Sequence, residues 1–144
     1  MIGQSKPTIR YPIGQELPRL LKSRTGMRFD DIRLESVREG RVKSDDLSID
    51  SDTLRMQAQV AREAGYLQLA SNLRRAAELV RIPNKRLLEI YETLRPRHST
   101  YAELLTISIE LEKDYEAPEN AQFVREAANA YRDAGLLRVS DKQL

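Results

Sequence analysis

The chain has 144 residues, 40% of them hydrophobic, and a formal net charge of +2 from 24 basic and 22 acidic side chains. This length is most simply one domain, and so small a basic excess does not indicate a strongly basic, phosphate-binding protein. There is no cysteine, which excludes disulfides, thiolate catalysis and thiolate metal sites, and no apolar run approaches the ~20 residues of a membrane-spanning helix.

Residues 1–49 are predicted to form an extended N-terminal arm with short helices. Three of the six prolines fall in the first 18 residues, where no long periodic apolar run exists. Short helices are expected at 17–23, 31–39 and 44–47. The Thr25-Gly26 turn and Gly40 end the first two of these helices. An arm of this kind is better suited to docking on a partner subunit than to forming its own core.

Residues 50–144 are predicted to form a helical body, a bundle of about five helices. The apolar spacing places these helices at 50–64, 66–80, 83–94, 100–115 and 118–134. Asp50 is the expected N-cap of the first helix, Thr100 and Glu103 form a capping box on the fourth, and Gly135 ends the last. The predicted fold class is therefore all-α, with the arm and body acting as a single functional domain.

Charges and apolar residues are unevenly distributed over the predicted helices. Residues 71–97 hold seven basic and three acidic side chains, whereas residues 99–133 hold three basic and eight acidic ones. Such segments meet complementary protein surfaces or remain solvated. The helix at 100–115 carries Ile107 and Ile109 on different faces, which indicates that a second body covers it.

No group of side chains with catalytic potential is evident. His98 is the only histidine, and its sequence neighbours supply no activating acid. The adjacent pairs Asp30-Asp31 and Asp45-Asp46 point apart on a helix or turn, so Asp31 and Asp45 are expected to cap or charge helix starts. A glycine-rich phosphate loop is absent. The sequence predicts no catalytic, cofactor-binding or metal-ligating residue.

One alternative is a free-standing helical adaptor or a helix-turn-helix DNA-binding regulator. The turn at 81–84 has a compatible length, and basic residues flank it: Arg74, Arg75, Lys85 and Arg86. Against this alternative, Glu78 and Glu89 interrupt the basic surface and no aromatic residues are interleaved with it. We therefore expect no nucleic-acid partner.

A series of short blocks runs in a fixed order over roughly residues 11–131. In chain order they are Tyr11-Pro12, Asp31-Ile32-x-Leu34-Glu35-x-Val37, Asp46-Leu47-x-Ile49, Thr53-Leu54-Arg55-x-Gln57-Ala58, Ala76-Ala77-Glu78-Leu79, the decapeptide LLEIYETLRP at 87–96, Ser99-Thr100-x-x-Glu103-Leu104-Leu105 and Phe123-Val124-Arg125-Glu126-Ala127-Ala128. No block is a catalytic signature, but together and in this order they resemble the small (gamma) subunit of adenosylcobalamin-dependent diol and glycerol dehydratases.

The resemblance implies a non-catalytic subunit of a lyase that converts a vicinal diol or glycerol to an aldehyde and water. The partners it implies are a large subunit, whose TIM barrel holds the active site, and a medium subunit, which helps to hold adenosylcobalamin, in a doubled heterotrimer (a heterohexamer). The small subunit would clasp the large one and stabilise it. This chain should bind no cofactor itself, because the cobalamin-binding pattern Asp-x-His-x-x-Gly is absent: Pro96 stands two residues before His98.

The residues expected at the subunit interface are Tyr11, Pro12, Leu34, Val37, Arg95 and Pro96. The family usually has an aromatic residue after Arg-Pro, whereas this chain has Arg97, so a contact there would change from stacking to charge pairing. Some members carry a long N-terminal extension that promotes packing into a microcompartment. This chain begins about ten residues before Tyr11-Pro12 and lacks the apolar core of a secretory signal, so a free cytoplasmic enzyme with no membrane partner is expected.

Overall fold

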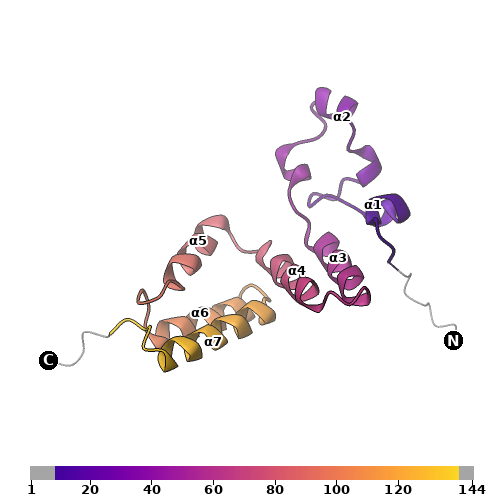
Figure 1. Cartoon of the computed structure of the whole chain (residues 1–144). Coiled ribbons are helices and arrows are strands. Elements are labelled where there is room, and N and C mark those ends of the chain that lie inside the picture. The colour runs from indigo at the N-terminus through magenta and orange to yellow at the C-terminus, as the bar shows by residue number, and fades with distance from the viewer. Residues whose placement is uncertain (1–8, 140–144) are drawn as a thin grey trace, which may run out of the picture. The chain divides into compact units, whose positions relative to one another are not determined.

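The computed structural model describes residues 9–139 (Figure 1). Within this range every regular element is helical apart from an isolated antiparallel bridge between Lys22 and Arg28, which confirms the all-α prediction. The chain divides into two compact units, Met1–Ala77 and Glu78–Leu144. The first unit holds the predicted arm together with residues 50–77. That the arm is a separate docking element ending at residue 49 stays a prediction.

The arm contains short helices, as predicted, although their bounds differ. They are α1 (Ile13–Glu16), α2 (Leu34–Arg38) and the 3-10 helices η1 (Pro18–Leu20), η2 (Phe29–Asp31) and η3 (Ser44–Leu47). The helix expected at 17–23 is only the single turn η1, because the chain turns back after it: Ser23 donates its N–H to the Met27 carbonyl at 2.8 Å. The helix expected at 31–39 is divided between η2 and α2, because Arg33 is extended (φ −127°, ψ 161°).

The two longer helices that follow the arm are α3 (Ser51–Glu63) and α4 (Leu67–Leu79). Asp50 caps α3 as predicted, since its carboxylate accepts the Thr53 N–H at 2.8 Å. Gly65 ends α3 with φ +85°, a left-handed conformation that glycine adopts without strain, and Tyr66 donates its N–H back to the Ala61 carbonyl at 2.8 Å. The boundary between the two compact units falls near the end of α4.

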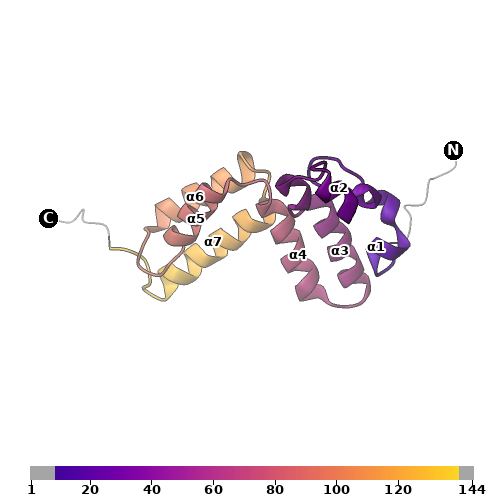
Figure 2. The same ribbon diagram turned by 90° about the horizontal axis from the view of Figure 1, so that it is seen from above.

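The second unit is built on α5 (Asn84–Thr93), α6 (Tyr101–Lys113) and α7 (Pro118–Asp133). In both views α6 and α7 lie side by side along their length (Figures 1 and 2). Small residues on α7, Ala121 and Ala128, are fully buried and allow this close approach. The core around them comprises Ile82, Ile90, Leu104, Ile107, Leu111, Ala117 and Val124.

Local sequence signals set the ends of α6 and α7 as predicted. The Thr100 N–H donates to Glu103 Oε2 at 2.7 Å, and the Glu103 N–H donates to Thr100 Oγ1 at 3.3 Å, which completes the capping box. Gly135, at φ +65°, ends α7, and the Leu136 N–H donates to the Tyr131 carbonyl at 2.8 Å. Among residues 9–139, no helix combines the length and apolar character needed to cross a bilayer.

Candidate subunit interface

His98 has an acidic partner that its sequence neighbours do not reveal. Its Nδ1 lies 3.1 Å from Oε1 of Glu92, because the chain turns tightly after α5 and the His98 N–H donates to the Arg95 carbonyl. The expectation that no acid lies near His98 is therefore wrong. Arg95 Nη1 binds the same carboxylate at 3.0 Å, so Arg95 and His98 share one exposed carboxylate. No group of three or more potential metal-ligating residues occurs within residues 9–139.

Asp31 and Asp45 lie in the first turns of η2 and η3, where they charge the helix starts as predicted, but the capping hydrogen bond of η3 is made by Asp46. Asp46 is buried, and its Oδ2 accepts the Lys43 N–H at 2.7 Å. Its Oδ1 accepts the hydroxyls of Thr25 and Ser23. The hydrogen bond from Thr25, followed by that from the Lys43 backbone, holds the pKa of Asp46 below its usual range. This carboxylate joins the turn at 23–27 to η3 and fixes the shape of the arm.

Ion pairs inside the second unit neutralise much of its charge. Arg86 binds Glu110 through two parallel hydrogen bonds, with Nε 2.7 Å from Oε1, and also reaches Glu89 at 2.9 Å. Arg86 lowers the pKa of Glu110, and Glu110 raises that of Arg86. Further pairs are Arg81–Glu116, Arg125–Glu112 and Arg138–Glu103. Because Arg86 is held by two carboxylates, a DNA-contacting role for this surface is not favoured.

Glu78 is buried, although the sequence places it on the polar face of its helix. It is only 7% exposed, and its two oxygens accept the N–H groups of Glu119 at 3.0 Å and Asn120 at 2.9 Å. Asn120 also donates its side-chain Nδ2 at 2.6 Å. One sequence signal points to such a partner: α7 begins after Ala117, whose side chain cannot cap it, so an acceptor has to come from elsewhere.

All six predicted interface residues are exposed: Tyr11, Pro12, Leu34, Val37, Arg95 and Pro96. The exposed fractions are 78% for Tyr11, 60% for Leu34 and 46% for Val37. Other large apolar side chains exposed on the arm are Leu20, Phe29, Leu47 and Ile49. So many apolar side chains on one short segment indicate a surface for another molecule. That these particular residues form the interface stays a prediction.

The predicted contact loop at Arg95–His98 is held in place by the segment after α7. The Arg97 N–H donates to the Leu136 carbonyl at 2.7 Å, and the Arg138 N–H donates to the Ser99 carbonyl at 2.8 Å. The guanidinium of Arg138 adds hydrogen bonds to the His98 carbonyl at 3.1 Å and to Glu103 at 2.6 Å. No pattern in the sequence indicates this pairing, because it connects residues about 40 positions apart.

On α6, the two isoleucines lie on different faces as predicted. Ile107 is 5% exposed and belongs to the core, whereas Ile109 is 50% exposed. The exposed Ile109 offers a second apolar contact. It stays a prediction that another protein covers this residue.

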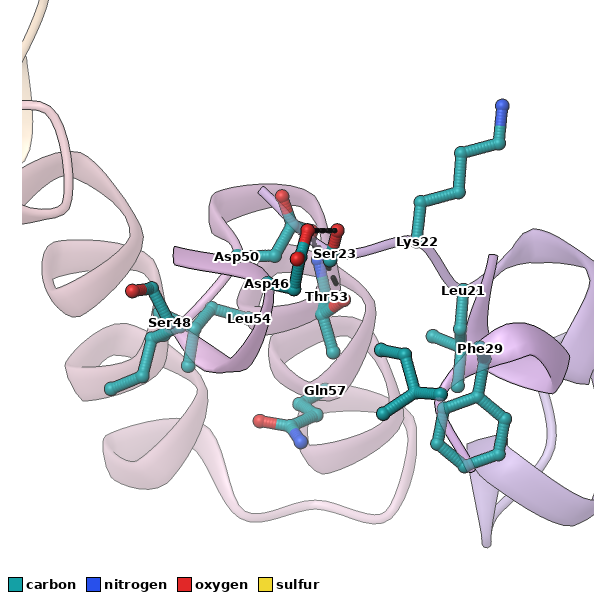
Figure 3. Close-up of a pocket in the computed structure, with 12 residues that line it drawn as sticks. Leu21, Lys22, Ser23, Phe29, Asp46, Ser48, Asp50, Thr53, Leu54 and Gln57 are labelled. Atoms are coloured by element: carbon teal, nitrogen blue, oxygen red, sulfur yellow. Dashed lines mark hydrogen bonds between the residues drawn. The ribbon is translucent and has the colours of Figure 1, made fainter. Parts of the chain in front are cut away.

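Pockets in the described part of the first unit include two beside α3. One, of about 450 Å³, opens between the arm and α3, and Phe29, Asp46 and Leu54 are among the residues that line it (Figure 3). The other, of about 510 Å³, is apolar and includes Tyr11 and Tyr66. The first unit therefore has pockets next to exposed apolar side chains of the arm, a combination that is common at protein–protein interfaces.

Comparison with known proteins identifies the family of the chain. Residues 7–138 match the family described as "Dehydratase small subunit". The chain is 44% identical over 131 residues to the propanediol dehydratase small subunit of Salmonella typhimurium and, to the same extent, to that of Citrobacter freundii. Each alignment covers 91% of this chain and 76% of the relative.

Proposed function

The chain belongs to the dehydratase small-subunit family, and on this premise we propose that it is the non-catalytic small subunit of an adenosylcobalamin-dependent diol or glycerol dehydratase. The main support for this proposal is the 44% identity to two propanediol dehydratase small subunits, which extends over 91% of the chain. The assembled enzyme would be a cytoplasmic carbon–oxygen lyase that converts a vicinal diol to an aldehyde and water.

The role proposed for this chain is to stabilise the large catalytic subunit. Burying one large apolar side chain contributes about 1.5–3 kcal/mol, and the arm exposes several, including Leu34, Val37 and Ile49. Packing these side chains on the large subunit would remove apolar surface of both partners from water. The assembly proposed is a doubled heterotrimer with large and medium subunits.

The proposal places the cobalamin in the other subunits, because the side chains of this chain do not suit it. The only histidine, His98, shares the Glu92 carboxylate with Arg95 in an exposed loop, where Nδ1 lies 3.1 Å from Oε1. Pro96 also occupies the position at which the cobalamin-binding pattern has an aspartate. The proposed role of this chain is therefore structural: it binds the other subunits and stabilises the complex.

Co-expression tests the proposal. A tag on this chain should recover the large and medium subunits of the same enzyme in a fixed ratio, and the recovered complex should dehydrate a diol when adenosylcobalamin is added. If all three chains are soluble and folded but do not associate, the proposal is wrong.

A further inference from the structure

We infer that the pocket between the arm and α3, here called the arm pocket, receives an apolar side chain from an acidic segment of the large subunit. This inference rests on the proposed function and adds to it a docking site and the chemistry of the segment that docks. Two separate observations support it: the character of the pocket walls and the charge of the adjoining loop.

The walls of the arm pocket are apolar where an inserted side chain would lie. Leu21 and Phe29 of the arm lie on one side and Leu54 of α3 on another, as Figure 3 shows, and Ile32 and Ile49 add to the lining. The volume of about 450 Å³ lies within the range of about 300–1,000 Å³ typical of pockets that take small organic groups. A leucine, methionine or phenylalanine side chain fits such a space.

The carboxylates that line the arm pocket are already engaged by the chain itself. Asp50 Oδ1 accepts the N–H and the hydroxyl of Thr53, at 2.8 and 3.0 Å. Asp46 accepts hydrogen bonds at both oxygens, from Lys43 on one side and from Thr25 and Ser23 on the other. Since a site for a polar ligand needs convergent free polar groups, these walls suit an apolar anchor.

The loop beside the arm pocket is strongly basic. Residues 17–28 hold four basic side chains and no acidic one. Arg28 pairs with Asp31 at 3.1 Å, whereas Arg19, Lys22 and Arg24 have no ion-pair partner within residues 9–139. Lys22 lines the pocket, and in Figure 3 its side chain extends away from Leu21 and Phe29. A partner that seats an apolar anchor here therefore meets cations, and carboxylates beside the anchor would neutralise them.

A second copy of this chain is less suited to supply that acidic surface. Most carboxylates of the second unit are paired with arginines of the same unit, as in the Arg86–Glu110 and Arg81–Glu116 pairs. In the loop at 17–28, by contrast, only Arg28 has such a partner among the described residues, whereas Arg19, Lys22 and Arg24 have none. The occupant that fits is therefore the large subunit, to which the arm is proposed to dock.

Charge reversal tests this inference. The variant K22E/R24E changes two exposed side chains, and we expect it to bind the isolated large–medium subcomplex at least about tenfold more weakly than the original chain, as measured by biolayer interferometry. The affinity of the original chain should also fall more steeply with added salt than that of the variant. The matched control R62E/K113E makes the same change of charge at exposed positions on α3 and α6 and should bind within about twofold of the original.

Filling the pocket provides a second test that involves no change of charge. Ser48 lines the arm pocket, and Ser48→Phe should weaken binding by about tenfold while thermal unfolding by circular dichroism shows a folded chain. Undiminished binding by both K22E/R24E and S48F would overturn the inference while leaving the proposed function standing. Failure of the original chain to bind the subcomplex would instead count against the proposed function. Salt-sensitive dimers of the isolated chain that K22E/R24E abolishes would identify a second copy as the occupant and likewise overturn the inference.

Discussion

The carboxylate of Glu78, at the end of α4, caps α7 through Asn120, whose backbone N–H lies 2.9 Å and side-chain Nδ2 2.6 Å from Oε2. These two residues are 42 positions apart in the chain, so a buried hydrogen-bonded carboxylate connects the start of the second unit to its longest helix. The first four N–H groups of a helix need such acceptors. A negative charge at this end also interacts favourably with the positive end of the helix dipole.

Replacing Glu78 by alanine should therefore destabilise the second unit. We expect a loss of about 1–3 kcal/mol in the free energy of unfolding, because the partly buried N–H of Glu119 and the buried N–H of Asn120 lose their acceptor. Urea unfolding followed by circular dichroism measures it. The control Glu126→Ala, at an exposed position on α7, should change stability by no more than about 0.5 kcal/mol. Equal effects of the two substitutions would contradict the capping role of Glu78.

The capping box of α6 gives a prediction about Thr100, and a second threonine of the same helix, Thr106, serves as the control. Thr100→Ala should lower stability by about 1 kcal/mol, because the Glu103 N–H loses its acceptor. Thr106, in the middle of the same helix, only donates its hydroxyl to the Ala102 carbonyl, so Thr106→Ala should be neutral or slightly stabilising. Thermal unfolding of both variants tests the difference, and a larger loss for Thr106→Ala would contradict it.

The Arg86–Glu110 pair predicts a pH dependence of stability. Arg86 holds the pKa of Glu110 below its ordinary value of 4.5, so the folded state binds this proton more weakly than the unfolded state does. The stabilisation is complete above pH 4.5 and is lost as pH falls through the lower, folded-state pKa. Glu110→Gln should therefore cost about 1 kcal/mol at neutral pH and progressively less in acid. Chemical unfolding of both proteins over a pH series measures this, and a constant difference would contradict it.

Exposed residues on α2 should matter for assembly and not for folding. Leu34→Ser together with Val37→Ser should leave the stability of the isolated chain within about 0.5 kcal/mol, because both side chains are largely exposed. The same variant should recover markedly less of the large subunit in co-purification, since two apolar contacts are lost. The control Val139→Ser alters another highly exposed apolar residue and should co-purify normally. If the original chain, the double variant and the Val139→Ser control recover equal amounts of the large subunit, α2 is not part of the interface.

The sequence predicted the features that depend on short-range signals. Helix caps at Asp50 and Thr100 and the helix end at Gly135 all lie within a few residues of the groups they bind, so their patterns are readable. The all-α fold follows from apolar periodicity over five segments, and all five helices are found there. The bounds of the short arm helices were predicted less well, because turns such as that from Ser23 to Met27 compete with helix over so few residues.

Contacts between distant residues could not be predicted. Glu78 reads as a surface residue until α7 is placed beside it, and the Arg138–Ser99 pairing requires the chain to return after α7. In the candidate interface, Leu34 and Val37 are exposed, as expected for residues that the family resemblance places at an interface. Apolar periodicity alone would have predicted that they are buried in a core. The basic loop at 17–28 was not singled out from the sequence, because its importance depends on the lack of ion-pair partners for Lys22 and Arg24 within residues 9–139.

The most direct test of the central claim is the rate of diol dehydration in three samples with adenosylcobalamin present: this chain alone, the large and medium subunits alone, and all three together. Our account predicts no turnover by this chain alone and the highest, most persistent activity when all three are combined. Turnover of a diol by the purified chain alone would contradict it.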